Sequence, residues 1–371
     1  MKIYYIGSPE VFTEGASAIH VARMCEAFSK IGEEVTLMLP ISSDRIDKFF
    51  SYYGIKKNFK IYPSMGFLKG PKRHFFHGVS SFFKVLTLGD YDCIVTRNVT
   101  FAFLASYLKN NIIVDIHHPP VNLFSRIAIK RFVESKNILK IICNSEGTRN
   151  AIDKESNKKF QVLNNGVNIQ DFKPNEEYIK FKNQLNIPID VKVISYVGNT
   201  YKGRGIEKII RLAKDYKNIY FLVIGGEKED NLKYKRLITE QRNIFFTNHV
   251  PHVEIPNYLM ISDILLIPYD SDFTIKGDQV ASSFSSPIKL FEYLSAKKPI
   301  IASDLPSFVN ILKNNKNALL VNPDSYKEIK DSVQILLDNP EKREQLSNEA
   351  FELSKDFSWE NRAKKILSGL K

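Results

Sequence analysis

The chain repeats one pattern twice: short, continuously apolar segments alternate with segments whose apolar residues recur at helical spacing. In the first half, the apolar segments are residues 1–7, 33–40, 91–98, 111–119 and 140–145. In the second half they are residues 192–199, 219–226, 244–250, 263–269 and 298–304. Uninterrupted apolar strands separated by helices are typical of parallel sheets that are covered on both faces. The sequence therefore predicts an α/β chain with two doubly wound units in series.

Several classes of protein are disfavoured by what the chain lacks. Neither half carries G-x-G-x-x-G after its first strand, which argues against an enzyme that holds NAD in the ordinary way. No stretch of 18 or more uncharged apolar residues predicts a membrane-spanning helix. The opening segment KIYYIG fits a strand better than a signal peptide. Cys25, Cys93 and Cys143 are odd in number and lack metal-ligand spacing, so we expect reduced thiols in a cytoplasmic protein.

The charge of the chain indicates an anionic partner. The formal net charge is +12, which suits nucleic acid, a membrane surface or a phosphorylated substrate. Between Lys48 and Gly89 there is no Asp or Glu, while eight Lys or Arg alternate with aromatic residues. Such a segment suits anionic lipid headgroups. The other interpretation is that its aromatic residues are core and its lysines are solvated, and the sequence favours neither.

Two segments that follow predicted strands have the composition of an anion site. Gly15, Ala16 and Ser17 lie before a helix, where free backbone N–H groups favour anions, although a plain strand-to-helix connection fits equally well. The segment YVGNTYKGRGIEKII places Lys202 and Arg204 just before another helix. Positive side chains beside the positive end of a helix are unfavourable unless an anion binds there. This second segment therefore predicts a phosphate site in which Arg204 can hold two oxygens at once.

The segment SSPIKLFEYLSAKKPIIASDLP, residues 285–306, predicts a loop, a helix and a buried strand. We expect Ser286 as the N-cap and Pro287 as the first helical residue. Lys289 and Glu292 are three residues apart and so share one face of a helix that is otherwise apolar. As an ion pair they would contribute only about 0.2–0.5 kcal/mol. In the functional interpretation, Glu292 binds a sugar hydroxyl and Lys289 binds a phosphate.

The segment VDIHHPP ends another predicted strand with Asp115, His117 and His118. A histidine and a carboxylate at this place can orient a hydroxyl group or stabilise a positive transition state. Two adjacent histidines without a third ligand at suitable spacing do not predict a zinc site.

Taken in order, these motifs resemble a known family. YVGNTYKGRGIEKII, FLVIGG, DILLIPY and SPIKLFEYLSAKKPIIASDLP are similar to the nucleotide-sugar half of retaining glycosyltransferases of family 4. VDIHHPP, ICNSEGTRNAI and VLNNGVNIQDFKP resemble the first domain of that family, and FSWENRAKKIL resembles its terminal helix. The likeness covers nearly the whole chain and is weakest from residue 48 to residue 89.

The resemblance implies the GT-B fold, in which two Rossmann-like domains face one another across a cleft. It also implies an organisation along the chain, because the Asn-rich and Pro-rich segment 162–188 matches the exit toward the linker. We expect a first, acceptor-side domain at 1–168, a linker at 169–190, a nucleotide-sugar domain at 191–354, and a helix crossing back to the first domain at 355–371.

The resemblance also implies roles for individual residues. Arg204 matches a basic residue that grips the donor diphosphate, and Glu292 matches the glutamate that binds the ribose. His117 falls near the histidine close to the reacting sugar carbon, with Asp115 in the acidic position before it. The remaining donor-binding positions are Gly15, Ala16, Gly198, Asn199, Ser286, Pro287, Ile288, Lys289 and Leu290, of which Lys289 is also expected to act in catalysis.

This chain departs from the family at two positions. Phe284 stands where many members have a first glutamate, and Asn199 stands where many have a basic residue. Sugar recognition must then come from elsewhere, with Asp278 and Gln279 as candidates.

The function implied is metal-independent, retaining transfer of a sugar from a UDP-sugar or GDP-sugar to a glycan or lipid-linked acceptor in cell-surface polysaccharide biosynthesis. The nucleotide sugar is a substrate, so no cofactor is expected. We expect a cytoplasmic protein that can lie at the inner face of the plasma membrane. One alternative is a basic nucleic-acid-binding protein, although no recognised module supports it. The other is a non-catalytic relative that only binds a nucleotide sugar.

Overall fold

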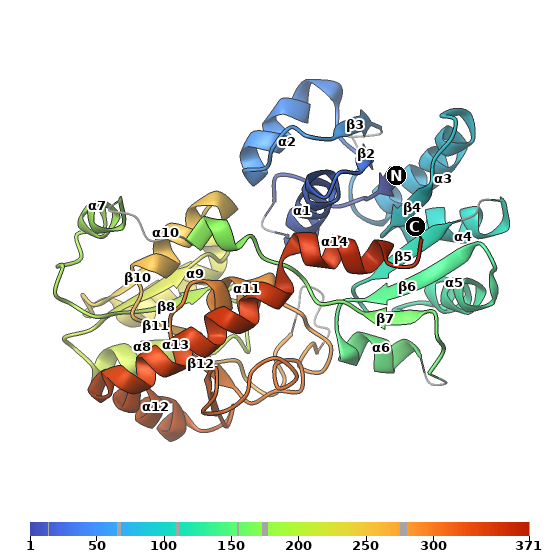
Figure 1. The fold of residues 1–371 in the computed structure, drawn as a ribbon. Helices are drawn as coiled ribbons and strands as arrows, with labels where there is room; N and C mark the ends of the chain where they lie inside the picture. Colours follow the sequence, from blue (N-terminus) through green and yellow to red (C-terminus); the bar gives the residue numbers. More distant parts are fainter. Residues whose placement is uncertain are drawn as a thin grey trace. The chain divides into compact units, whose positions relative to one another are not determined.

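The computed structural model describes residues 1–13, 15–64, 68–108, 111–153, 156–172, 177–274 and 280–370. The chain divides into two compact units. The first unit contains residues 1–166 together with 359–371, and the second contains residues 167–358. Each is built on its own parallel sheet, which confirms the predicted α/β class with two doubly wound, Rossmann-like units (Figure 1).

The sheet of the first unit consists of β1 (Lys2–Ile6), β2 (Glu34–Leu39), β3 (Lys60–Pro63), β4 (Cys93–Thr96), β5 (Ile112–Ile116), β6 (Ile138–Cys143) and β7 (Phe160–Val162). The strand order is β3-β2-β1-β4-β5-β6-β7, and neighbouring strands are parallel. The order reverses between β1 and β4, so the carboxyl ends of these strands form a topological switch point, the usual place for a ligand in such sheets.

The helices of the first unit are α1 (Ala16–Lys30), η1 (Ser43–Arg45), α2 (Ile46–Tyr53), α3 (Gly70–Thr87), α4 (Val99–Leu108), α5 (Leu123–Glu134), α6 (Glu146–Ile152) and α14 (Trp359–Leu367). Helix α14 packs against α1, so the C-terminal segment is part of the first unit although the second unit precedes it in the chain (Figure 1). Helices α3, α4 and α5 pack side by side.

The sheet of the second unit consists of β8 (Val193–Val197), β9 (Tyr220–Ile224), β10 (Ile244–Phe246), β11 (Ile264–Ile267), β12 (Ile300–Ser303) and β13 (Leu319–Val321), in the order β10-β9-β8-β11-β12-β13. Its helices are η2 (Ile169–Phe172), α7 (Glu177–Gln184), α8 (Ile206–Asp215), α9 (Lys228–Lys235), η3 (Arg236–Ile238), η4 (His252–Glu254), α10 (Ile255–Met260), α11 (Ile288–Ser295), α12 (Tyr326–Asp338), α13 (Pro340–Ser354) and η5 (Lys355–Phe357). The switch point here lies between β8 and β11.

All ten strands predicted from apolar segments are present, whereas β3, β7 and β13 were not predicted. All three are partly buried edge strands, where a continuous apolar segment is not required. Part of the expected linker is folded, since η2 and α7 belong to the second unit. Helix α11 begins one residue later than predicted: Pro287 is the N-cap, in an extended conformation, and Ser286 precedes it.

The basic and aromatic segment between Lys48 and Gly89 divides into two parts. Four of its aromatic residues from α2 to β3 are core, because Phe49, Phe50, Tyr53 and Phe59 are buried. On α3, in contrast, Phe75, Phe76 and Phe83 are exposed while Phe82 is buried. The core interpretation is therefore confirmed from α2 to β3, whereas the lipid interpretation stays a prediction for α3.

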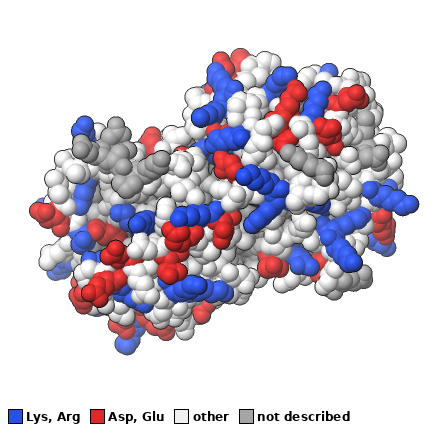
Figure 2. Space-filling model, viewed as in Figure 1, with Lys and Arg blue, Asp and Glu red and all other residues white. Residues whose placement is uncertain are grey.

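Among the described residues, no helix combines the length and the apolar character needed to cross a membrane. The net charge of +12 does not produce one uniformly basic surface in the view of Figure 2, where acidic and basic side chains are interspersed.

Candidate functional site

The loop that follows β8 is pressed against the chain that follows β11. Gly198 has φ +137° and Gly205 has φ +73°, conformations that other residues rarely adopt. A Cβ atom at Gly205 would lie 1.9 Å from the carbonyl oxygen of Pro268, and one at Gly203 would lie 2.8 Å from Cα of Phe273. The glycines of the motif thus permit close packing that carries Arg204 into the switch point.

Arg204 is buried in an aromatic environment. Its guanidinium carbon lies 4.5 Å from the ring centre of Tyr269 and 4.7 Å from that of Phe273. One terminal nitrogen donates to the carbonyl oxygen of Thr274 at 3.0 Å. Its Nε is buried and has no hydrogen-bond partner among the described residues. A buried donor without an acceptor is unfavourable, which indicates that a further acceptor binds here.

Lys289, on α11, reaches the same aromatic ring from another direction. Its Nζ lies 4.7 Å from the ring centre of Tyr269 and 4.1 Å from that of Tyr196. It donates a 2.6 Å hydrogen bond to the carbonyl oxygen of Val197, the last residue of β8. A Cβ atom at Gly198 would lie 2.7 Å from this Nζ, so only glycine leaves room for the lysine.

The two cations influence one another through this shared ring. Burial and the neighbouring Arg204 lower the pKa of Lys289 to about 8, although Tyr269 and Glu292 oppose the shift. Burial would raise the pKa of Tyr269, but Arg204 and Lys289 outweigh it and lower that pKa. Among the described residues, neither cation forms a salt bridge with a carboxylate. We call Arg204, Lys289, Tyr196 and Tyr269 the cation cluster.

Glu292, one turn after Lys289, contacts a residue that the sequence did not single out. Its Oε1 accepts a 2.6 Å hydrogen bond from Nε2 of His252, the first residue of η4. The carboxylate is buried, and Nδ1 of His252 is buried without a partner among the described residues. Lys289 and Glu292 thus bind different partners, which disagrees with a simple intrahelical ion pair.

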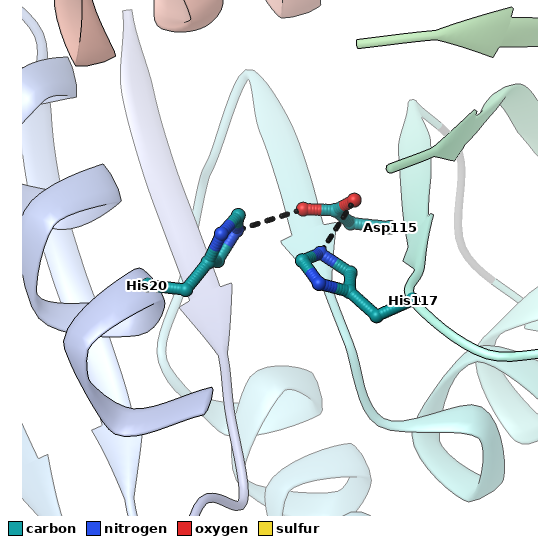
Figure 3. A group of neighbouring side chains, drawn as sticks. All are labelled: His20, Asp115 and His117. Carbon is teal, nitrogen blue, oxygen red and sulfur yellow. Dashed lines mark hydrogen bonds and ion pairs between the residues drawn. The ribbon is translucent and has the colours of Figure 1, made fainter. Parts of the chain in front are cut away.

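In the first unit, Asp115 is the centre of a second cluster, of which Figure 3 shows His20, Asp115 and His117. Its Oδ2 lies 3.1 Å from Nε2 of His20, on α1, and its Oδ1 lies 3.1 Å from Nε2 of His117. Arg362, on α14, donates to the same Oδ1 at 2.9 Å. The two imidazole rings meet edge to face, with ring centres 4.4 Å apart. We call these four residues the histidine cluster.

The protonation of the histidine cluster follows from burial and charge. Burial and the nearby Arg97 lower the pKa of His20 to about 4 and that of His117 well below 6.5. Burial opposes ionisation of Asp115, but Arg362 and the two histidines hold its pKa well below 3.8. At neutral pH the cluster is therefore a carboxylate, a guanidinium and two neutral imidazoles. Because a carboxylate only accepts hydrogen bonds, His117 carries its proton on Nε2 and keeps a lone pair on Nδ1. His20 lies between two acceptors, since its Nε2 faces Asp115 and its Nδ1 lies 2.9 Å from Oδ1 of Asn165.

The side chains of His20, Asp115 and His117 are close enough to hold a metal ion, since their ligand atoms all lie within 4.8 Å of one another. The sequence had paired His117 with His118 and found no third ligand. The structure supplies His20 instead, from a helix 95 residues before Asp115. However, Arg362 already neutralises Asp115, and a divalent ion would add two positive charges beside that guanidinium. The geometry therefore fits a hydrogen-bonded network better than a metal centre.

The sequence-predicted residues fall into two groups. Gly198, Arg204 and Lys289 meet around Tyr269, with Asn199 after Gly198, and with Ile288, Leu290 and Glu292 on the buried helix α11. Asp115 and His117 meet in the other unit, where Gly15 is the N-cap of α1 and Ala16 its first residue. Phe284 is part of the apolar core. Asp278 and Gln279 lie outside the described residues.

Sequence reasoning missed His20, Arg97, Arg362, His252, Tyr196 and Tyr269. Tyr196 and Tyr269 stand in or directly after apolar strands, where they read as core residues. Arg97 directly follows β4 at the switch point, and that position was the one available signal.

Comparison with known proteins relates part of the chain to a family. Residues 177–353 match the model of the family described as Glycosyl transferases group 1. The chain is 24% identical over 221 residues to the uncharacterised glycosyltransferase MJ1178 of Methanocaldococcus jannaschii, covering 60% of this chain and 56% of that one. It is 24% identical over 213 residues to the alpha-galactosylglucosyldiacylglycerol synthase of Streptococcus pneumoniae, covering 55% and 52%. The chain thus spans little more than half the length of these two relatives.

The fold extends over the whole chain in solved structures. The Anabaena protein Alr3699/HepE, crystallised in complex with UDP and glucose, superposes with a TM-score of 0.74 at 14% identity, covering 100% of this chain and 99% of that one. At this identity the likeness concerns the fold, which is that of GT-B glycosyltransferases.

Proposed function

We propose that this chain, a member of the glycosyl transferases group 1 family, transfers a sugar from a nucleotide-sugar donor to a glycan or lipid-linked acceptor. The observation that carries the proposal is the cation cluster. A buried arginine and a buried lysine share one aromatic ring at the switch point of the second sheet, and no described carboxylate neutralises either of them. Two buried cations without a neutralising carboxylate favour the binding of an anion.

A nucleoside diphosphate is the anion that best suits this arrangement. Arg204 offers an unsatisfied Nε–H, and a guanidinium can hold two phosphate oxygens in a fixed geometry. Preorganised cations stabilise the charge that develops on a leaving diphosphate, so the proposed reaction needs no metal. The Anabaena structure contains UDP and glucose, which supports a UDP-sugar as the donor.

Glu292 is the proposed ligand of the nucleotide ribose. Its carboxylate is buried and is oriented by His252, so it can accept a hydrogen bond from a ribose hydroxyl without leaving its place. The donor-binding segment would continue along Ser286 to Leu290, at the start of α11. The family resemblance supplies these two roles, and the burial of the whole helix agrees with them.

The histidine cluster is the proposed catalytic part of the first unit. In a retaining transfer the sugar passes through a cation-like state while the diphosphate leaves and the acceptor attacks from the same face. The lone pair on Nδ1 of His117 can accept a proton or stabilise this positive charge. Asp115 holds the ring in the required tautomer, and Arg362 keeps that carboxylate ionised.

The acceptor, the cellular location and the biosynthetic role are proposed from the family resemblance and from one relative. The S. pneumoniae relative is a diacylglycerol glycolipid synthase by name, which supports a lipid-linked acceptor. We propose that the protein works in the cytoplasm at the inner face of the plasma membrane, in cell-surface polysaccharide biosynthesis. Nucleic acid binding is the competing function, and filter binding to DNA and RNA at physiological salt tests it.

The experiment that tests the function compares Arg204→Ala with Lys202→Ala. Lys202 precedes the same helix but is exposed, so it is a matched control. A thermal-shift screen against UDP-sugars and GDP-sugars first identifies the donor, and a transfer assay follows. Removal of one preorganised donor costs roughly 2.7–4 kcal/mol of barrier, so Arg204→Ala should lower turnover about a hundredfold or more. Lys202→Ala should keep nearly full activity.

Two outcomes of that experiment would contradict the proposal. Near-normal turnover of a folded Arg204→Ala variant would remove Arg204 from the site. Tight nucleotide-sugar binding by the wild type without transfer to any acceptor, and without slow hydrolysis of the donor, would favour a non-catalytic relative.

A further inference from the structure

Helix α3 is apolar on two sides. Phe82 and Val85 pack into the core of the first unit, as expected for a helix that covers a sheet. Phe76, Phe83 and Leu86 nevertheless lie on the outside, and their spacing of seven and then three residues places them along one stripe. The side chain of Phe83 is 62% exposed and that of Phe76 is 46% exposed. Exposed apolar side chains that form a continuous stripe commonly mark an interaction surface, so this stripe requires an explanation.

The apolar surface continues onto the two neighbouring helices. On α4 the exposed large apolar residues are Tyr107 and Leu108, and on α5 they are Leu123, Phe124 and Ile127. The ring of Phe103 joins the two helices, because its centre lies 5.6 Å from that of Tyr107 and 5.5 Å from that of Phe124. Since α3 packs against α4 and α4 against α5, the exposed side chains belong to one three-helix layer. We call this surface the α3–α5 face.

The charges on the α3–α5 face are predominantly positive, although Arg73 pairs with Glu10. The described part of the segment before and within α3 carries Lys69, Lys72, Arg73 and Lys84, without an acidic residue. Helix α4 carries no charged residue, and α5 carries Arg126, Lys130 and Arg131 against a single Glu134 at its last position. The only other carboxylate between Cys93 and Val133 is Asp115, which is buried in the histidine cluster. Arg131 also stacks on Tyr107, with its guanidinium carbon 4.0 Å from the ring centre.

Three kinds of partner would cover an apolar surface, and the charges select one. A second copy of the chain, packed face to face, would bring like charges together. Nucleic acid would satisfy the cations but would leave Leu86 and Ile127 against a polar backbone. A bilayer with anionic headgroups matches both features, since exposed aromatic and aliphatic side chains enter the acyl boundary while Lys and Arg contact the headgroups.

We infer that the α3–α5 face is the surface with which this protein docks on an anionic lipid bilayer. The inference relocates the membrane contact that the sequence suggested: the aromatic residues of α2 and β3 are core, and α4 and α5, which the sequence did not indicate, contribute to the surface. It stands independently of the proposed transferase activity, because it uses neither the cation cluster nor the histidine cluster.

Vesicle co-sedimentation tests the inference with the full-length chain and without any sugar nucleotide. The vesicles contain either phosphatidylcholine alone or phosphatidylcholine mixed with phosphatidylglycerol. The wild-type chain should pellet with the mixed vesicles and remain in solution with phosphatidylcholine alone or in high salt. Phe76→Ser/Phe83→Ser should lower the partition coefficient at least tenfold. Lys72→Glu/Lys130→Glu should lower it more than tenfold, since each basic residue near such a surface contributes about fivefold.

A matched control keeps the result specific to this face. Leu237 and Ile335, in the second unit, are 60% and 49% exposed, so Leu237→Ser/Ile335→Ser removes similar apolar surface elsewhere. This control should bind vesicles like the wild type. Circular dichroism and thermal unfolding confirm that each variant is folded, and exposed substitutions of this kind usually change stability little.

Three results would overturn the inference. The first is wild-type protein that stays in solution with anionic vesicles. The second is vesicle binding that the two α3–α5 variants leave unchanged or that the control variant weakens equally. The third is a wild-type dimer in light scattering that Phe76→Ser/Phe83→Ser converts to a monomer, which would assign the face to a second copy of the chain.

Discussion

The two clusters differ in how their buried charges are paired. In the histidine cluster a buried carboxylate is matched within the chain: Arg362 neutralises Asp115, and the imidazoles of His20 and His117 each lie within hydrogen-bonding distance of it. In the cation cluster two buried positive groups share one aromatic ring, and among the described residues no carboxylate pairs with them. One cluster is complete within the chain, and we propose that a ligand completes the other.

This difference predicts how each cluster affects the stability of the folded chain. A buried charge whose partner is removed is strongly destabilising, whereas a buried charge that has no partner already destabilises the folded chain. Removing a cation from the histidine cluster should therefore destabilise the protein, and removing one from the cation cluster should not. The same type of substitution, a buried cation to methionine, tests both.

The largest effect is expected for Arg362→Met. The substitution keeps the apolar stem of the side chain but leaves Asp115 buried without its cation, and it removes the donor to the carbonyl oxygen of Asn164. Breaking a buried ion pair in this way costs about 3–5 kcal/mol. Urea denaturation should show a loss of this size in the free energy of unfolding.

The control for that prediction is the double variant Arg362→Met/Asp115→Asn. Removing both charges leaves no unpaired ion, so the double variant should recover most of the lost stability. If the single variant is as stable as the wild type, or if the double variant is no better than the single one, the pairing of Arg362 with Asp115 does not stabilise the unit.

A smaller and opposite effect is expected for Lys289→Met. The pKa of Lys289 is lowered to about 8, so the protonated lysine is less favourable in the folded chain than in the unfolded chain. Methionine removes that unfavourable charge, and the free energy of unfolding at pH 7 should not fall. Nucleotide binding should weaken by about tenfold to a hundredfold, because a hydrogen bond to a charged group contributes roughly 1.5–3 kcal/mol.

The pH dependence of nucleotide affinity separates this role from a purely structural one. Above pH 8 the free wild-type protein loses the charge on Lys289, so its affinity in calorimetry should fall toward that of Lys289→Met, while the affinity of the variant changes little. Equal pH profiles for the two proteins would exclude Lys289 as the phosphate cation.

The two clusters also differ in how far the sequence could predict them. The cation cluster comes largely from two short motifs, residues 198–205 and 285–295. Their glycines, and their charged residues at the start of a helix or on an apolar helix, can be recognised in the sequence. Only its tyrosines were hidden, because Tyr196 and Tyr269 stand among apolar strand residues. The architecture was equally accessible, since apolar strands and amphipathic helices follow from local periodicity.

The histidine cluster could not be assembled from local pattern. Its four residues come from α1, from β5 and the turn that follows it, and from α14, and Arg362 lies 247 residues from Asp115. His20 stands inside an apolar helix, where a single histidine usually indicates nothing more than packing. Pairings of this kind depend on the chain returning to the first unit, which is a property of topology rather than of spacing.

The smallest expected effect is the change that His20→Gln causes in the pH dependence of stability, and it distinguishes the two clusters. His20 has a pKa of about 4 in the folded chain and an ordinary value of 6.5 when unfolded, so between these values the unfolded chain binds more protons. Stability of the first unit should therefore fall as the pH decreases from about 6.5 toward 4, by up to about 1.4 kcal/mol per pH unit for each such histidine. Lys289 acts in a different pH range: its pKa of about 8 makes the stability of the folded chain rise with pH only above 8.

Trp359, the one tryptophan in the sequence, lies 5.3 Å from His20 by ring centres, so its fluorescence reports unfolding of the first unit. Urea titrations followed by this signal give the free energy of unfolding at each pH. His20→Gln should weaken its dependence on pH below 6.5 by the contribution of one histidine and leave its dependence on pH above 8 unchanged. If the variant and the wild type showed the same pH dependence below 6.5, His20 would not be held neutral in the folded chain.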